Sequence, residues 1–303
     1  MSSFLQQAIN HKLASPPAFL VSNLQYEVIM GSRAYSAHTP TSDYDMQGFA
    51  MPPKDVMFPH LAGIIPGFGN QGIKFEQYQQ QKIFLPTPKS SDIKEVSFNI
   101  YNIVKYFQLC MDNNPNMIDS LFVPENCVTH TTQVGQLVRD NRRLFLSRKC
   151  WPKFKGYAFQ QLHKLDNKKP EGNRLELVEK YGYDVKHAYN IVRLVDECEQ
   201  ILVTEDLDLQ RAREQMKSVR RGEWTEQQLK DFFQSKLVAL EIAYANCKLP
   251  EVPDESKLKR LLIECLEIHY GDLSKAIVQP NAAVDALREI SQILERSRAV
   301  YGN

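Results

Sequence analysis

Short apolar runs broken by proline and glycine occupy the chain before about residue 130. These runs are YEVIM at 26–30, DYDMQGFAMPP at 43–53, QKIFLP at 81–86 and EVSFNIY at 95–101. Their length and their β-branched and aromatic residues predict strands bounded by turns. One helix is predicted among them, because YNIVKYFQLCMD at 101–112 repeats apolar residues at helical spacing and NNPN then supplies a stop. This part of the chain is therefore predicted to be α/β.

After about Lys153 the pattern changes to long amphipathic segments, which predict packed helices with one face in water. The segments lie at 176–202, 225–247, 255–271 and 282–300. The prolines of LPEVPDES at 249–256 predict a loop, and the Gly- and Gln-rich stretch 67–82 is assigned to a mobile loop. We therefore expect an α+β protein. A domain over 1–140, with a mixed sheet and helices, is followed by an all-helical domain over 141–303.

Composition argues against several classes of protein. The 37 basic and 36 acidic residues give a net charge of +1, so no overall field favours a nucleic acid or a membrane. Six cysteines without a C-x-x-C pair predict reduced thiols and neither a zinc knuckle nor a disulfide framework. No run is long enough for a signal peptide or a membrane span. We expect a cytoplasmic protein without structural zinc, whose oligomeric state the sequence leaves open.

Two aspartates close the stretch GSRAYSAHTPTSDYD at 31–45, which follows a predicted strand. In an extended segment Asp43 and Asp45 project from the same side, about 7 Å apart, so their charges repel. A divalent cation relieves that repulsion, and Mg²⁺ is usually held by one or two carboxylates with phosphate oxygens and water. Gly31 lets the backbone approach a ligand closely, and Ser32 with nearby amides can hold phosphate oxygens. The stretch therefore predicts a site where a triphosphate and a metal ion meet.

A simpler interpretation of the aspartate pair is a solvated turn or a helix cap, which an Asp-x-Asp tripeptide also forms. A helix cap would be followed by helical periodicity. The apolar run MQGFAM follows here instead, and it has strand character. The surrounding sequence therefore favours the metal site.

A basic and aromatic stretch, DNRRLFLSRKCWPKFKGY at 140–157, also has two interpretations. Cations interleaved with aromatic rings can neutralise and stack on a strand of nucleic acid. The same mixture more often packs between domains. The sequence favours packing at this stretch.

The stretch 31–45 resembles the Gly-Ser, spacer, Asp-x-Asp signature of the DNA polymerase β nucleotidyltransferase superfamily. Three segments together resemble a narrower family, the predicted nucleotidyltransferases that include YcgL-like and RlaP-type proteins associated with RNA repair. The segments are the signature with MQGFAMPP at 31–53, YNIVKYFQLCMDNNPNMIDSLFVP at 101–124 and YGYDVKHAYNIVRLV at 181–195. The resemblance implies a polymerase-β-like domain that transfers a nucleoside monophosphate from an NTP to a hydroxyl and releases pyrophosphate.

The resemblance also assigns roles to residues of the first domain. Asp43 and Asp45 would bind Mg²⁺, or Mn²⁺ in its place, in a two-ion mechanism. A third carboxylate is expected on a neighbouring strand, where Glu95 is our choice and Asp92 lies slightly earlier. An exposed acid at the start of a strand is the competing interpretation of Glu95. The remaining candidates are the expected nucleotide contacts Gly31, Ser32, Arg33 and Ser42.

The helical part contributes two further candidates. Lys186 and His187 lie within one helical turn, so they would meet the triphosphate across a cleft between the domains. A solvated helix face is the alternative interpretation of this cluster. Lys186 and His187 are kept as candidates because they lie in the third of the resembling segments.

The acceptor of the nucleotide follows from family association alone, which points to RNA and to a 3′ end in need of repair. Three alternatives remain open. The acceptor is a protein hydroxyl that receives AMP or UMP, or it is a small molecule, because the fold does not fix the acceptor. The third alternative is a non-catalytic nucleotide-binding module with a regulatory role.

Overall fold

The computed structural model describes residues 3–58, 74–86, 93–167, 172–271 and 290, and its first half combines strands with short helices. The strands are β1 (Leu24–Met30), β2 (Tyr44–Ala50), β3 (Gln77–Pro86), β4 (Ile93–Asn102) and β5 (Val128–Thr131). The helices of this half are α1 (Phe4–Asn10), α2 (Lys54–Met57), α3 (Ile103–Met111), α4 (Pro115–Phe122) and α5 (Gln133–Asp140), with short 3₁₀ turns η1 (Gly31–Arg33), η2 (Glu125–Cys127) and η3 (Arg142–Phe145).

The five strands form one mixed sheet in the order β3-β4-β2-β1-β5. β1 pairs antiparallel with β2 and β5, and β3 pairs antiparallel with β4. β2 and β4 are parallel neighbours, with Tyr44 opposite Val96 and Asp45 opposite Ser97. Because parallel strands run in the same direction, β2 and β4 begin at the same edge of the sheet. The expected mixed sheet is confirmed.

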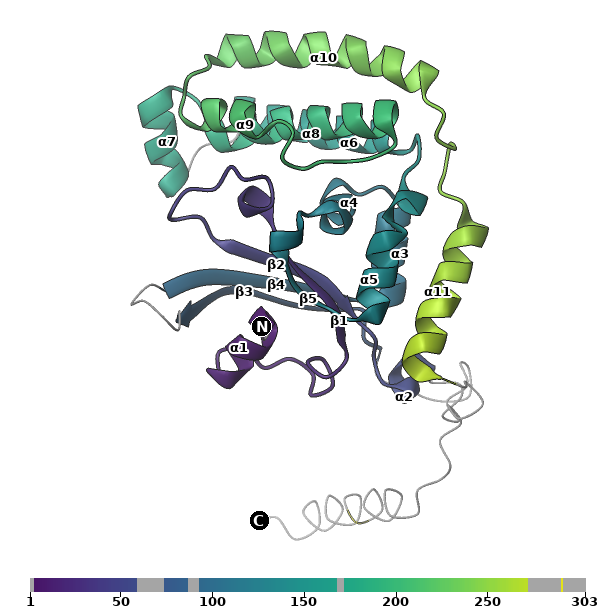
Figure 1. Ribbon diagram of the computed structural model, residues 1–303. Coiled ribbons are helices and arrows are strands. Elements are labelled where there is room, and N and C mark those ends of the chain that lie inside the picture. The colour runs from purple at the N-terminus through teal and green to yellow at the C-terminus, as the bar shows by residue number, and fades with distance from the viewer. Residues whose placement is uncertain (1–2, 59–73, 87–92, 168–171, 272–289, 291–303) are drawn as a thin grey trace, which may run out of the picture.

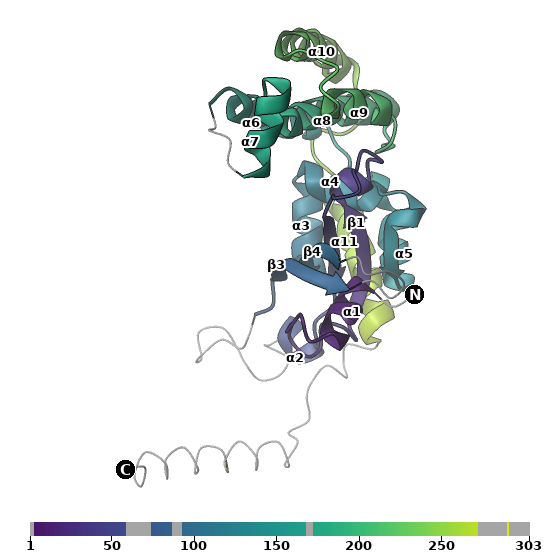
Figure 2. The ribbon, with the colours of Figure 1, turned by 90° about the vertical axis from the view of Figure 1, so that its left-hand side faces the viewer.

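The two faces of the sheet have separate hydrophobic clusters. Met46, Val96 and Phe98 belong to the smaller cluster, together with apolar residues of α1. Alternate residues of β1 and β2, such as Val28 and Phe49, point to the opposite face and join the larger cluster with α3, α4 and α5. Figures 1 and 2 show α1 on one side of the sheet and α3, α4 and α5 on the other.

The second half is helical over its described residues, as expected. Its helices are α6 (Cys150–Asn167), α7 (Asn173–Tyr181), α8 (Val185–Thr204), α9 (Arg213–Arg220), α10 (Glu226–Asn246) and α11 (Glu255–Tyr270). α8 is central, since it packs against α6, α9 and α10, whereas α11 returns to contact α5 and η3 (Figure 1). The helix expected over 282–300 lies outside the described residues, apart from position 290. Within the described part, no helix has both the length and the apolar character to cross a bilayer.

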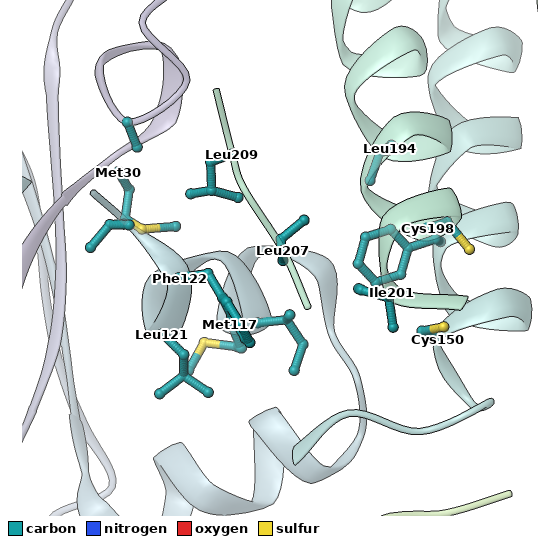
Figure 3. Packing of buried hydrophobic residues seen from close by; sticks show 14 of the residues in the cluster. Met30, Met117, Leu121, Phe122, Cys150, Leu194, Cys198, Ile201, Leu207 and Leu209 are labelled. Atoms are coloured by element: carbon teal, nitrogen blue, oxygen red, sulfur yellow. The ribbon is translucent and has the colours of Figure 1, made fainter. Parts of the chain in front are cut away.

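Apolar contacts continue without interruption from the sheet into the helical half. Figure 3 shows Met30 at the end of β1 and Phe122 of α4 on one side, with Leu207 and Leu209 between them and Ile201 of α8. All five side chains are buried. The division into domains at residue 140 stays a prediction, and a shared core joins its two parts.

The loop assignment for 67–82 is wrong over residues 77–82, while the described residues 74–76 lie outside helices and strands. β3 begins at Gln77 and pairs with β4 as far as Pro86. β3 is an edge strand, and its residues up to Lys82 lie mostly toward solvent. Its glutamine-rich part therefore shows no apolar pattern that would indicate a strand. Residues 67–73 lie outside the described part of the chain.

The basic and aromatic stretch at 140–157 packs between elements, as the sequence favoured. Trp151 and Phe154 are buried in the larger cluster. Lys149 and Lys153 both pair with Asp112, at 2.5 and 2.6 Å. Rings that are buried and cations that are already paired do not form a stacking surface for nucleic acid.

A buried ion cluster fixes α8 to the sheet half. The Arg193 guanidinium donates to the carboxylate of Asp119 on α4, to the Tyr35 hydroxyl (2.7 Å) and to Glu197 (3.4 Å). Tyr35 itself donates to Asp119 at 2.7 Å. Burial raises the pKa of Glu197 well above its usual range despite the nearby Arg193. Arg193 is thus a cation in contact with both buried carboxyl groups, and such a counter-charge is what a buried acid requires.

Arg193→Met is expected to lower the free energy of unfolding by about 3–5 kcal/mol, because it leaves a buried carboxylate without its cation. Arg213→Met is the matched control. The pair formed by Arg213 with Glu214 is exposed, so its loss should change stability by less than about 1 kcal/mol. Urea unfolding of both variants measures the difference, and equal effects would contradict the structural role of the cluster.

Candidate active site

The aspartate pair lies at the edge where β2 begins. Asp43 immediately precedes β2 and Asp45 is its second residue, while Tyr44 between them points to the other face. Both aspartates keep contact with solvent. Asp45 pairs with Met30 at the end of β1, so the turn that starts at Gly31 lies directly beside its carboxylate.

Glu95 lies on the strand beside the aspartates. Because Tyr44 is opposite Val96 and Asp45 opposite Ser97 in the parallel pair, Glu95 occupies the register position next to Asp43. Alternation along β4 gives Glu95 the same face as Ser97 and the opposite face from the buried Val96. The structure thus brings all three predicted carboxylates to one edge of the sheet. Asp92 lies outside the described residues.

Gly31 is required by two features of the turn after β1. Its φ of +65° lies in the left-handed region that side chains disfavour. A Cβ at this position would lie 2.8 Å from Oδ2 of Asp45. Backbone hydrogen bonds close the turn, and among them Tyr35 N–H donates to the Gly31 carbonyl and Ala37 N–H to the Ser32 carbonyl. Glycine therefore allows the turn to approach the carboxylate closely.

A cavity of about 660 Å³ opens in front of the carboxylates, between the sheet edge and helices α7, α8 and α9. Seven predicted site residues line it: Gly31, Ser32, Ser42, Asp43, Asp45, Glu95 and Lys186. The helical half thus supplies one wall, and the sheet half supplies the other. The volume is within the range usual for small-molecule sites.

Arg33 and His187 are the two predicted contacts that do not line this cavity. The Arg33 guanidinium stacks on the Tyr44 ring at 3.6 Å and donates to the carbonyls of Ser42 and Asp43. Arg33 therefore holds the backbone that carries the first aspartate. His187 is buried, and its ring lies behind the cavity wall between Gln161 and Arg174.

Sequence reasoning missed three cations that line the cavity: Lys82, Arg174 and Arg220. Lys82 lies where the β3–β4 register shifts, and its φ is +57°. A strand irregularity of this kind changes the direction of the side chain. Arg220 donates to the Ala37 carbonyl from a basic run whose composition is its only signal. Arg174 precedes its segment's apolar pattern and has no motif around it.

Electrostatics distinguish Asp45 from ordinary surface acids. Partial burial, followed by repulsion from Asp43 and Glu95, raises the pKa of Asp45 to about 6, and the positive charge of Lys186 opposes the shift. No ion pair joins any of the three carboxylates to a cation within the described residues. Their shared repulsion is the local condition that a divalent cation would remove.

The donor set fits a hard cation that shares its coordination with a ligand. In the described part of the chain, no three His, Cys, Asp or Glu side chains are arranged to hold a metal ion on their own. Carboxylates are ligands that Mg²⁺ accepts, and Mg²⁺ commonly takes its remaining ligands from phosphate and water. Asp43 and Asp45 therefore suit an ion that arrives with a nucleotide better than a permanent protein-only site.

A second, larger cavity of about 810 Å³ lies between α3 and the start of α11, and it lacks this chemistry. Its lining is mainly apolar and also includes the charged residues Lys105, Asp112, Lys149, Glu255 and Lys259. Asp112 is already paired with Lys149. The smaller cavity combines unpaired carboxylates with cations and is the better candidate for catalysis.

Gly31→Ala is expected to lower the free energy of unfolding by about 1–2 kcal/mol, because alanine resists the left-handed backbone and its Cβ would displace Asp45. Gly156→Ala is a matched control in helix α6, where an added Cβ meets no atom within 4 Å. That substitution should raise stability by about 0.5–1 kcal/mol. Chemical denaturation measures both, and a neutral Gly31→Ala would show that the turn tolerates a side chain.

Asp45→Asn is expected to stabilise the metal-free protein at pH 8 by about 1 kcal/mol, a value reduced from the full pKa shift because the side chain contacts solvent. The pKa of this acid is raised on folding, so stability falls as pH rises from about 4 to about 6. The variant should therefore gain nothing at pH 3.5, where both states are protonated. Urea unfolding across this range tests the sign, and a gain independent of pH would contradict it.

The chain matches a described protein family over most of its length. Residues 5–264 match the family described as RNA repair pathway DNA polymerase beta family, RlaP. A solved structure of a nucleotidyltransferase-like protein from Exiguobacterium sibiricum is similar over 94% of this chain and 91% of its own, at 11% identity and a TM-score of 0.27. A search of curated proteins finds no match. Because the family match covers most of the chain, this nucleotidyltransferase belongs to the RNA repair pathway DNA polymerase beta family.

Proposed function

We propose that the protein is a Mg²⁺-dependent enzyme that transfers a nucleoside monophosphate from an NTP to the 3′ hydroxyl of RNA. The observation that carries the transfer chemistry is the meeting of Asp43, Asp45 and Glu95 at one sheet edge, opposite a cationic wall. The RNA acceptor is supported by the family description alone. The free state of all six cysteines supports a reducing compartment such as the cytoplasm.

Each wall of the cavity has its own task in this proposal. Asp43 and Asp45, with Glu95 beside them, would hold two Mg²⁺ or Mn²⁺ ions, which would supply positive charge to offset the negative charge of the phosphates. Ser32 and the backbone amides of its turn hold phosphate oxygens, and Lys186 approaches them from α8.

The transfer exchanges one phosphorus–oxygen bond for another. The acceptor hydroxyl oxygen forms a bond to the α-phosphorus of the NTP. The bond from that phosphorus to the oxygen bridging the α- and β-phosphates breaks, and pyrophosphate leaves with the electron pair. Glu95 accepts the hydroxyl proton, since it lies at the edge of the carboxylate group on the neighbouring strand.

Incubation of the protein with each α-³²P-labelled NTP, Mg²⁺ and cellular RNA tests the proposal. Label is expected in RNA, and Asp43→Asn and Asp45→Asn should each lower the rate by more than about a hundredfold, because each removes a charged metal ligand. Asp231→Asn is the control, since Asp231 is exposed on α10, away from the cavity, and accepts a hydrogen bond from Gln227 in the same helix.

Other destinations of the label contradict the RNA acceptor. Label in protein that depends on Asp43 would assign AMP or UMP transfer to a protein hydroxyl. Label in a small molecule would assign that class of acceptor. NTP binding without labelled product in any fraction would favour a non-catalytic regulatory module.

A further inference from the structure

Arg174 is the cavity cation whose position the protein fixes most completely. It lies in the first turn of α7, and its NH1 group donates to Oδ2 of Asp184 at 2.9 Å. The same NH1 group contacts Nε2 of His187. Asp184 and His187 are both buried, so they hold the guanidinium from behind the cavity wall.

The hydrogen bonds behind Arg174 also define the state of His187. The amide oxygen of Gln161 lies 2.7 Å from Nδ1 of His187, and an amide oxygen only accepts. Nδ1 therefore carries the proton, and Nε2 is left as an acceptor for the Arg174 N–H. In this arrangement His187 donates a hydrogen bond to Gln161 through Nδ1 and accepts one from Arg174 through Nε2.

Only one nitrogen of Arg174 takes part in these contacts. Within the described residues, Nε and the second terminal nitrogen have no hydrogen-bond partner, and about a third of the side chain is exposed. This free edge belongs to a residue that lines the cavity with Asp45 and Lys186. A guanidinium edge with two free donors matches the paired oxygens of a phosphate.

Asp184 links Arg174 to the first turn of α8, where Lys186 lies. One carboxylate oxygen of Asp184 caps α8 by accepting from the backbone N–H of Lys186 and of His187, while the other holds Arg174. Lys186 is close enough to Asp45 to lower its pKa. Arg174, Lys186 and Asp45 thus line one cavity, in which a metal-bound nucleotide would place its phosphates.

We propose that Arg174 binds the triphosphate of the NTP, with His187 and Asp184 as the positioning residues that aim it. This inference rests on the proposed nucleotidyl transfer. Three carboxylates, two divalent cations and a triphosphate leave about three negative charges uncompensated, which requires further cations in the cavity. Arg174 supplies one of these charges in a fixed orientation.

Equilibrium binding tests this assignment without turnover. The probes are the four α,β-methylene nucleoside triphosphates and the corresponding monophosphates, in Mg²⁺. Arg174→Gln is expected to weaken triphosphate binding about ten- to a hundredfold and to change monophosphate binding less than about twofold. Arg174→Lys should recover only part of the loss, because lysine keeps the charge without the fork.

Two further variants separate positioning from folding. His187→Phe should weaken triphosphate binding and spare monophosphate binding, since it removes the acceptor that orients Arg174. Arg143→Gln is the matched control, because Arg143 forms an exposed ion pair with Asp206 away from the cavity. Thermal unfolding checks that each variant is folded. If Arg174→Gln does not fold, Arg174→Lys replaces it in the binding measurement.

The outcomes distinguish this inference from the proposed function. Unchanged triphosphate affinity in both Arg174 variants would overturn the inference and leave nucleotidyl transfer standing. If the Arg174 variants kept their triphosphate affinity but had a raised KM for RNA, Arg174 would contact the acceptor instead, and the inference would also be overturned. Failure of the wild-type protein to bind any of the triphosphates would overturn both proposals.

Discussion

Parallel pairing of β2 with β4 is the constraint on which the candidate site depends. The pairing starts both strands at one edge and sets Glu95 beside Asp43, although the two residues are far apart in the sequence. A shift of one residue would turn Glu95 to the opposite face, where Val96 and Phe98 pack against α1. The apolar residues on that face therefore fix the register, and through the register they fix the carboxylates. Hydrophobic packing on one side of the sheet sets the spacing of charges on the other.

A second constraint is the orientation of α8 over that edge. The residues of α8 that face the cavity lie near its beginning, and Arg193 lies two turns later in the buried cluster with Asp119 and Tyr35. Tyr35 closes the turn that begins at Gly31, since its N–H donates to the Gly31 carbonyl. One buried group of side chains thus contacts both walls of the cavity. Lys186 can approach Asp45 only because this contact and the shared apolar core set how the helical half packs on the sheet.

Local sequence predicted strands β1, β2 and β4, helices α3, α8, α10 and α11, and the aspartate signature, because apolar periodicity and turn residues are short-range signals. It did not single out strand β5 or helices α1, α4, α5, α6 and α9. It failed at β3, where an edge strand needs no apolar pattern and the pairing with β4 supplies its order. It failed in another way at His187, whose neighbours in sequence suggest a cationic face while Gln161 and Arg174 enclose its ring. Arg174 itself had no sequence signal, since its place in the site depends on contacts made from another helix. Side-chain direction across an interface is set by tertiary packing, which a single sequence does not display.

The chain contains two groups of close acidic side chains, and their differences separate structure from function. Asp119 and Glu197 are buried, and the protein provides Arg193 as a cation that contacts both carboxyl groups. Asp43, Asp45 and Glu95 open into a cavity, and cations on the opposite wall line it without forming ion pairs with them. A charge that is removed from water requires a counter-charge within the protein, because its desolvation is otherwise too costly. Leaving charges unpaired and accessible to solvent has a smaller penalty, and that penalty is recovered when a mobile cation binds. Acid clusters that keep an open face and lack an internal partner are therefore the ones that a metal-bound substrate can complete.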